Sequence, residues 1–196
     1  MKTSNVVLII IAVLFLMGGC SISTSYNSMV NSQEATNSSW ADVESNYQRR
    51  ADLIPNLVSV VQGYAKHESG TLTAVIEARA KATAINIDPS KATPAQLKAF
   101  ASAQGEISAA LGKLMMIKEA YPELKANQNF RDLQSQLEGT ENRINVARNR
   151  FNDTTKEYNQ LIRSFPKNII ANMFGFEKRA YFEADANAKE APKVKF

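Results

Sequence analysis

Apolar side chains recur three and four positions apart over most of the chain, which is the period of helices that bury one face. The first register comprises Tyr26, Gln33, Trp40, Tyr47, Ile54, Val61, Glu68 and Val75, with companions at Met29, Thr36, Val43, Arg50, Leu57, Tyr64, Thr71 and Ala78. It runs through Pro55, and Asp52 lies where a cap for a restarted helix would be. We therefore predict a kink or a brief break at Pro55 between roughly collinear segments. The first clear stop is Asn-Ile-Asp-Pro-Ser at 86–90.

A second set of helices follows this stop. Thr93, Pro94 and Gln96 have the pattern of a capping box that starts a new helix, and Tyr121-Pro122 ends it. The most regular apolar stripe then runs from Phe130 to Phe165 through five heptads. A helix of this length is about 55 Å long, and other helices must cover it because so long a stripe cannot stay in water.

The C-terminal part carries less regular signals. Pro166 ends the long helix, and a short helix is expected over 168–174, closed by Gly175. The aromatic side chains of Phe176, Tyr181 and Phe182 are expected to dock on the helices, and residues 184–196 to form a mobile tail. The sequence therefore predicts an all-α protein. Its bundle, over residues 26–183, would be elongated, antiparallel and up-down, with about four long helices plus a short C-terminal helix.

Composition narrows the function classes. With 44% hydrophobic residues the chain is not disordered, and eight Gly and six Pro in 196 residues are too few for an all-β chain. A single Cys and a single His exclude a disulfide scaffold, a Cys-built zinc site and a two-His metal site. The net charge of +4 is too mild for a nucleic-acid binder. We expect no cofactor, no metal and no nucleic-acid partner.

The N-terminus has the pattern of a targeting segment. A short basic start and the apolar run Val6–Met17 precede Gly18-Gly19-Cys20, which is typical of a bacterial lipoprotein signal. We predict a signal peptide over 1–19, lipid attachment at Cys20 and an anchor or linker over 20–25. The alternative is an uncleaved transmembrane helix over 6–22, whose seventeen residues are near the lower limit for crossing a bilayer.

The candidate chemistry gathers near Arg49, Arg50 and Asp52. Arg50 falls on the apolar stripe, where an unpaired guanidinium would be costly, so an acidic partner is expected. Glu44, Asp52 and Glu141 are the candidates. The favoured interpretation is a structural ion network that fixes helix register; the alternative is a partly buried polar site for an anionic ligand. His67-Glu68 is not a zinc motif, because the position four after His67 is Thr71.

One run resembles a known family: Arg49-Arg50-Ala51-Asp52-Leu53-Ile54-Pro55-Asn56-Leu57-Val58, continued by Gly63-Tyr64-Ala65-Lys66-His67-Glu68. It is similar to the signature of the LemA family of bacterial membrane-anchored proteins. Further matches are Tyr26-Asn27, Trp40-Ala41, Tyr121-Pro122-Glu123-Leu124-Lys125-Ala126, Phe130, Glu141, Ile144, Ala147-Arg148, Tyr158-Asn159, Phe165-Pro166 and Tyr181-Phe182-Glu183, over about residues 24–184. The resemblance implies an antiparallel helical bundle behind one N-terminal anchor, and it supplies no catalytic residues. Many members keep a membrane-spanning helix, whereas Gly18-Gly19-Cys20 here indicates lipid attachment.

Three functional hypotheses follow. The leading one is a non-enzymatic helical scaffold or adaptor that is tethered to a membrane of the cell envelope, facing the periplasm or exterior, and binds another envelope protein. The second is membrane remodelling through rod assembly or amphipathic faces. The third is a ligand-binding or enzymatic site around Arg49, Arg50 and Asp52. Arg49 and Arg50 are adjacent in sequence, so only one of them can face the bundle interior, which argues against a convergent site.

Overall fold

The computed structural model describes the backbone of residues 3–183 and the side chains of residue 5 and residues 21–183. The described chain contains helices and no strand, so the predicted all-α class is confirmed. The helices are α1 (Thr3–Tyr64), α2 (Ser69–Thr83), α3 (Pro94–Met116), the short 3-10 helix η1 (Ile117–Glu119), α4 (Pro122–Ala126), α5 (Gln128–Arg163) and α6 (Lys167–Phe174). The four longest helices are very unequal, from 62 residues in α1 to 15 in α2, so the predicted bundle of about four long helices is not confirmed.

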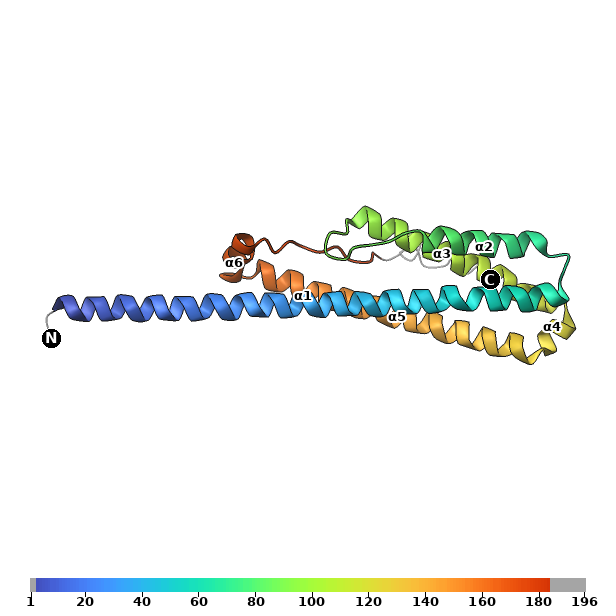
Figure 1. Ribbon diagram of the computed structural model, residues 1–196, viewed down its shortest axis with the longest axis horizontal. Coiled ribbons are helices and arrows are strands. Elements are labelled where there is room, and N and C mark those ends of the chain that lie inside the picture. The colour runs from blue at the N-terminus through green and yellow to red at the C-terminus, as the bar shows by residue number, and fades with distance from the viewer. Residues whose placement is uncertain (1–2, 184–196) are drawn as a thin grey trace, which may run out of the picture.

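The helices form an elongated body around α1 (Figure 1). Helix α5 lies antiparallel along α1, and the pair of α2 and α3 packs beside the C-terminal half of α1 (Figure 1). Helix α6 lies at the opposite end of the bundle from α4, level with the place where α1 leaves its partners. Residues 20–25, expected to link anchor and bundle, lie within α1.

The brief break allowed for at Pro55 is absent, because α1 continues through this residue as one helix. Proline has no N–H, so the carbonyl of Ala51, four residues earlier, loses its usual helical donor. Arg79 of α2 supplies the replacement: its Nε donates to the Ala51 carbonyl oxygen at 2.7 Å. Ala51 is buried, where an unpaired carbonyl would be costly. A side chain from the next helix therefore stabilises an uninterrupted α1.

We expect Arg79→Met to lower the free energy of unfolding by about 1–3 kcal/mol, the usual cost of leaving a buried acceptor unpaired. In a Pro55→Ala background position 55 again carries an N–H, so the same Arg79→Met change should cost less. Denaturant unfolding of the two single variants and the double variant measures this coupling. Strictly additive effects would contradict the assignment.

The chain reverses direction earlier than predicted. Helix α1 ends at Tyr64, residues 65–68 form a turn, and α2 begins at Ser69. The apolar register continues across this turn at Val75, which is buried, and at Ala78, which is half-buried, so periodicity alone gave no stop signal. Tyr64, predicted on the buried stripe, is exposed, and its hydroxyl accepts a hydrogen bond from Asn127 at 2.9 Å.

Other boundaries agree with the sequence because their signals are local. The Thr93 hydroxyl caps α3 by accepting from the Gln96 N–H, and the Gln96 side chain accepts from the Thr93 N–H, which is the expected capping box. Helix α6 ends at Gly175, whose φ of 74° lies in the left-handed region that favours glycine.

Three apolar clusters follow one another along the body. The cluster at the α4 end joins α1, α2 and α3 and includes Leu57, Val61 and Leu114. A middle cluster is aromatic and gathers Trp40, Tyr47, Phe100, Phe151 and Phe182. The third, next to α6, comprises Met29, Tyr158, Ile162, Ile170 and Ala171.

Candidate functional site

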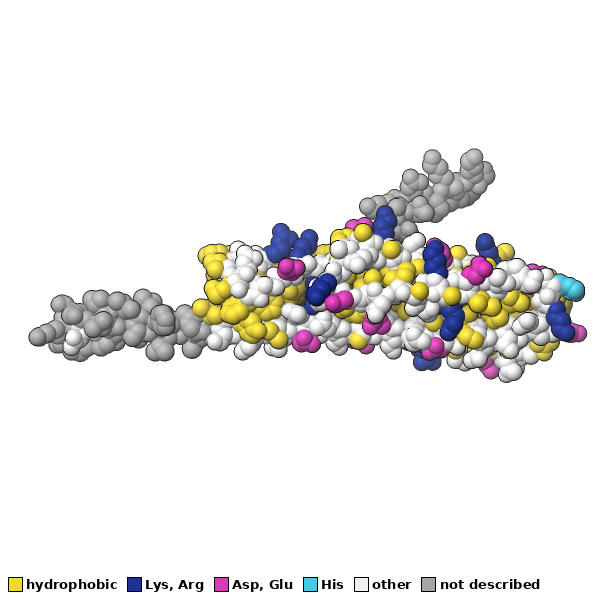
Figure 2. Space-filling view, turned by 45° about the horizontal axis from the view of Figure 1, so that its top comes forward, with side chains coloured by type: hydrophobic (Ala, Val, Ile, Leu, Met, Phe, Trp, Pro, Cys, Tyr) yellow, Lys and Arg dark blue, Asp and Glu magenta, His cyan; other side chains and the backbone are white. Residues whose placement is uncertain are grey.

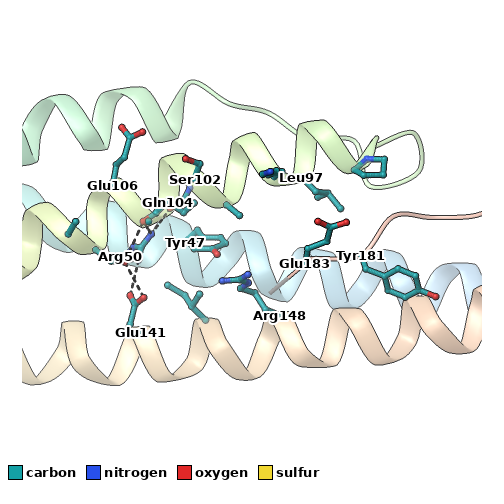
Figure 3. Close-up of a pocket in the computed structure, with 17 residues that line it drawn as sticks. Tyr47, Arg50, Leu97, Ser102, Gln104, Glu106, Glu141, Arg148, Tyr181 and Glu183 are labelled. Atoms are coloured by element: carbon teal, nitrogen blue, oxygen red, sulfur yellow. Dashed lines mark hydrogen bonds and ion pairs between the residues drawn. The ribbon is translucent and has the colours of Figure 1, made fainter. Parts of the chain in front are cut away.

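Arg50 occupies the interior of the bundle, between α1, α3 and α5 (Figure 3). It lies on the stripe of α1 that faces the other helices, and only 1% of its surface is exposed. A guanidinium at such a position requires acceptors on every side. The neighbouring helices supply acceptors for its two terminal nitrogens.

Three side chains and one backbone carbonyl accept from Arg50. Its Nη1 donates to Glu141 Oε2 and to Ser108 Oγ, both at 2.8 Å. Its Nη2 donates to the Gln104 side-chain oxygen at 2.6 Å and to the Gln104 backbone oxygen at 3.1 Å. Ser108 Oγ also donates to the second oxygen of Glu141 at 3.2 Å. We call Arg50, Gln104, Ser108 and Glu141 the Arg50 network.

The charge of Arg50 interacts with a carboxylate and with an aromatic ring. Glu141 neutralises it, but the Glu141 side chain is 43% exposed, so the ion pair reaches the surface. The Arg50 guanidinium also lies 5.1 Å from the centre of the Tyr47 ring, a cation–π distance. Arg50 Nε is buried and has no acceptor among the described residues.

A cavity of about 630 Å³ opens beside the Arg50 network. Its charged lining consists of Arg50, Lys98, Arg148, Glu106, Glu141 and Glu183. Three cations face three carboxylates, so the wall gives no net preference for an anion. Burial raises the pKa of Tyr47, opposed by the positive charges of Arg148 and Arg50, so this hydroxyl stays protonated at neutral pH.

The structure brings together two of the four residues that the sequence analysis grouped. Arg50 and Glu141 form an ion pair, whereas Arg49 and Asp52 are exposed on the outer face of α1. Asp52 accepts a hydrogen bond from Gln48 at 2.8 Å and takes no part in the network.

His67 is exposed in the turn after α1. Sequence reasoning missed Gln104 and Ser108, since no local pattern links them to Arg50.

A second polar feature, also missed, fastens the extended segment 176–183. The side-chain amide of Asn159 in α5 bonds both the N–H and the carbonyl of Arg179, each at 2.9 Å. Seven residues earlier, Asn152 bonds the N–H and carbonyl of Phe182 at 2.9 and 3.0 Å. The spacing of two helical turns puts both amides on one face of α5, which was the available signal.

Arg179 is held in this segment without a carboxylate within ion-pair distance in the described chain. Its Nη1 donates to the Asn37 side-chain oxygen at 2.7 Å, and its guanidinium lies 5.2 Å from the centre of the Tyr158 ring. Burial lowers the pKa of Arg179, and the nearby Tyr158, Asp88 and Glu34 oppose this shift. The arginine thus ties the segment to both α1 and α5.

The side chains of the predicted targeting region, including Cys20, lie outside the described residues, as does the predicted tail, 184–196. Over the residues searched, no helix contains an apolar stretch long enough to cross a membrane. The described side chains also include no group of three His, Cys, Asp or Glu residues that could hold a metal ion. Lipid attachment at Cys20 stays a prediction.

Comparison with known proteins decides the family. The model of the LemA family matches residues 39–196, most of the chain. The chain belongs to the LemA family. The matched range contains the whole Arg50 network and both asparagines that hold the C-terminal segment.

Individual relatives of this LemA-family chain are distant in sequence. Magnetosome protein MamQ 1 of Paramagnetospirillum magneticum is 27% identical over 179 residues, which cover 81% of this chain and 64% of the relative. Magnetosome protein MamQ of Magnetospirillum gryphiswaldense is 27% identical over 178 residues, with 80% and 64% covered. Protein LemA of Metamycoplasma hominis is 29% identical over 137 residues, with 70% and 58% covered. The chain therefore spans less than two thirds of the length of these relatives.

Proposed function

We propose that this LemA-family chain is a non-enzymatic helical scaffold or adaptor, tethered to a membrane of the cell envelope, that binds another envelope protein. The observation that carries the proposal is the single helix α1, which includes position 20, the predicted site of lipid attachment, and continues to the far end of the bundle. A tether and a bundle joined by one helix hold the bundle at a fixed distance from the membrane. A scaffold needs such a fixed distance to present its binding surface to a partner in the same membrane.

The chemistry of the Arg50 network supports a structural role. Its hydrogen-bonding groups largely satisfy one another, with the Arg50 guanidinium donating to Glu141, Ser108 and Gln104. A catalytic group would instead be left free to reach a substrate. The names of the relatives, LemA and magnetosome protein MamQ, also do not denote enzymes.

A ligand-binding role for the cavity beside Arg50 is the alternative. Its volume of about 630 Å³ would admit a small molecule. Its balanced charges and the engagement of Arg50 with Glu141 argue against the anionic ligand that the sequence suggested. Stability and cell function of Arg50 variants separate the two roles, as described in the Discussion.

The tether is tested at Cys20. If Cys20 is acylated, Cys20→Ser should leave an unprocessed precursor and abolish incorporation of labelled fatty acid, as seen by gel mobility and metabolic labelling. Ser21→Ala, next to the acceptor, is the matched control and should be processed normally. An unlabelled product of the same size in wild type and Cys20→Ser, retained in the membrane fraction, would instead support an uncleaved helix.

The partner is tested by photo-crosslinking in cells. Ile76, Met116 and Val146 are exposed apolar side chains on three different helices, away from α6, so they sample separate surfaces. We expect a photoreactive residue at one of them to give a discrete adduct with another envelope protein, identified by mass spectrometry. The adduct should disappear when the N-terminal tether is disabled. Adducts with the chain itself alone, or none from any surface, would contradict the adaptor role.

A further inference from the structure

Exposed apolar side chains gather at one end of the bundle. Figure 2 shows an apolar surface at the end where the N-terminal part of α1 leaves the other helices. The exposed large side chains there are Ile22, Tyr26, Phe165, Ile169, Met173 and Phe174, which we call the apolar collar. So many at one end are unusual for a surface facing only water.

The collar is built rigidly. Helix α6 buries Ile170 and Ala171 against the cluster of Met29, Tyr158 and Ile162, and this contact turns its other side outward. Ile169 and Met173 lie four residues apart on that outer side. Phe174 packs against Tyr26 of α1, with ring centres 4.9 Å apart. The exposed apolar surface is therefore a fixed part of the fold.

The position of the collar along α1 matches a membrane interface. The alternative transmembrane helix, 6–22, ends at Ile22, and Tyr26 follows by four positions. On a helix this separation is about 6 Å, which lies within the headgroup layer of about 5–8 Å on each side of the hydrocarbon. With lipid attachment at Cys20 instead, Ile22 and Tyr26 follow the acylated residue by two and six positions, or about 3 and 9 Å. Either form of anchor holds the collar against the bilayer surface.

The charges around the collar suit anionic lipid. Residues 163–178 contain Arg163, Lys167 and Lys178 against one acid, Glu177, a net of +2 (3 − 1). Residues 21–33 of α1 contain no charged side chain at all. Basic groups beside exposed apolar and aromatic groups are the features of segments that lie in the interface of an anionic membrane.

We propose that the apolar collar docks into the interface of the membrane that carries the tether, and that it favours anionic headgroups. This inference rests on the proposed tether, and it adds a second contact with the bilayer. With two contacts, the bundle would stand at a defined tilt rather than swing about its anchor. The collar would also leave the surfaces near α4 free for a protein partner.

The test uses the full chain reconstituted into vesicles of phosphatidylcholine and phosphatidylglycerol. An environment-sensitive fluorescent amino acid is placed at Met173, in the collar, and separately at Met116, at the far end of α3. The two methionines are matched controls, since they are 65% and 73% exposed. At position 173 we expect the fluorescence emission to shift to the blue on binding to vesicles and to be quenched by spin-labelled lipid. At position 116 we expect neither change.

Vesicle flotation, measured in parallel, reports the tether. A chain that floats while position 173 behaves like position 116 would overturn the collar and leave the tether intact. A chain that does not float would overturn the tether, and the collar with it. A blue shift at position 173 without quenching by spin-labelled lipid would mean that a second copy covers the collar, which also overturns the proposal.

Two further arms test the chemistry. Ile169→Asp introduces a charge at an exposed position, where the fold should tolerate it, and circular dichroism checks its helix content. We expect this variant to float normally but to lose lipid quenching at position 173. In vesicles of phosphatidylcholine alone the quenching should fall. Equal quenching in both vesicle types would overturn the preference for anionic lipid, and full quenching in Ile169→Asp would overturn docking through α6.

Discussion

Replacing Arg50 with alanine is expected to lower the free energy of unfolding by about 3 kcal/mol, at the lower end of the range for breaking a buried ion pair. The change removes the donors to Gln104, Ser108 and Glu141 and leaves a void between three helices. Water can reach Glu141, whose side chain is 43% exposed, and this limits the loss. Denaturant unfolding measures the effect.

The neighbouring Arg49→Ala is the matched control, because Arg49 is exposed on the same helix. It should change stability by less than about 0.5 kcal/mol. The double variant Arg50→Met, Glu141→Leu replaces both charges with apolar groups and should recover much of the loss. A ligand site predicts another pattern, in which Arg50→Ala keeps its stability but fails to complement a deletion strain. That result would overturn the structural interpretation.

Replacing Phe182 with alanine is expected to lower the free energy of unfolding by about 3 kcal/mol, as for other buried phenylalanines. The ring stacks on Trp40 at 5.7 Å and meets the edge of Phe151 at 5.6 Å, measured between ring centres. The Arg148 guanidinium lies 4.8 Å from its centre on another side. Because Phe182 lies in the segment 176–183, outside the helices, we expect the loss at the lower end of the usual range of about 3–5 kcal/mol.

Trp40 gives a direct readout of this change. It is the single tryptophan of the chain, so its emission should shift to the red when Phe182 no longer covers it. Amide exchange should also accelerate at Arg179 and at position 182, whose N–H groups are held by Asn159 and Asn152. Val146→Ala, at an exposed position of α5, should change neither. Unchanged emission and exchange in Phe182→Ala would contradict docking of the segment.

Features set by neighbouring residues could be predicted from the sequence. The stripe of α5 recurs every three or four positions, and Phe130, Ile144 and Phe151 are buried where it placed them. The start of α3 depends on Thr93 and Gln96, three residues apart, and the end of α6 on Gly175. In each case the residues that determine the structure lie within one or two helical turns of each other. A local sequence pattern is therefore enough to predict it.

Features set by distant residues could not be predicted. The continuity of α1 at Pro55 depends on Arg79, which reaches the Ala51 carbonyl from another helix, 28 residues along the chain. Arg50 had three acidic candidates by sequence, and the structure selects Glu141, 91 residues away. These contacts depend on how the helices pack, which a short stretch of sequence does not show. The pairing of Asn152 and Asn159 with the backbone of 176–183 is equally non-local.

Because α1 is unbroken, the number of residues in its N-terminal part sets the distance and rotation of the bundle relative to the start of the helix. From position 20 to Tyr64 the helix rises about 66 Å, and each residue added near its start would turn the bundle by about 100° about the helix axis. If the proposed tether holds the start of α1, two copies in one membrane carry their bundles at the same height, because no flexible joint interrupts α1. The number of residues between tether and bundle thus determines the height at which a neighbouring molecule meets each helix of the bundle.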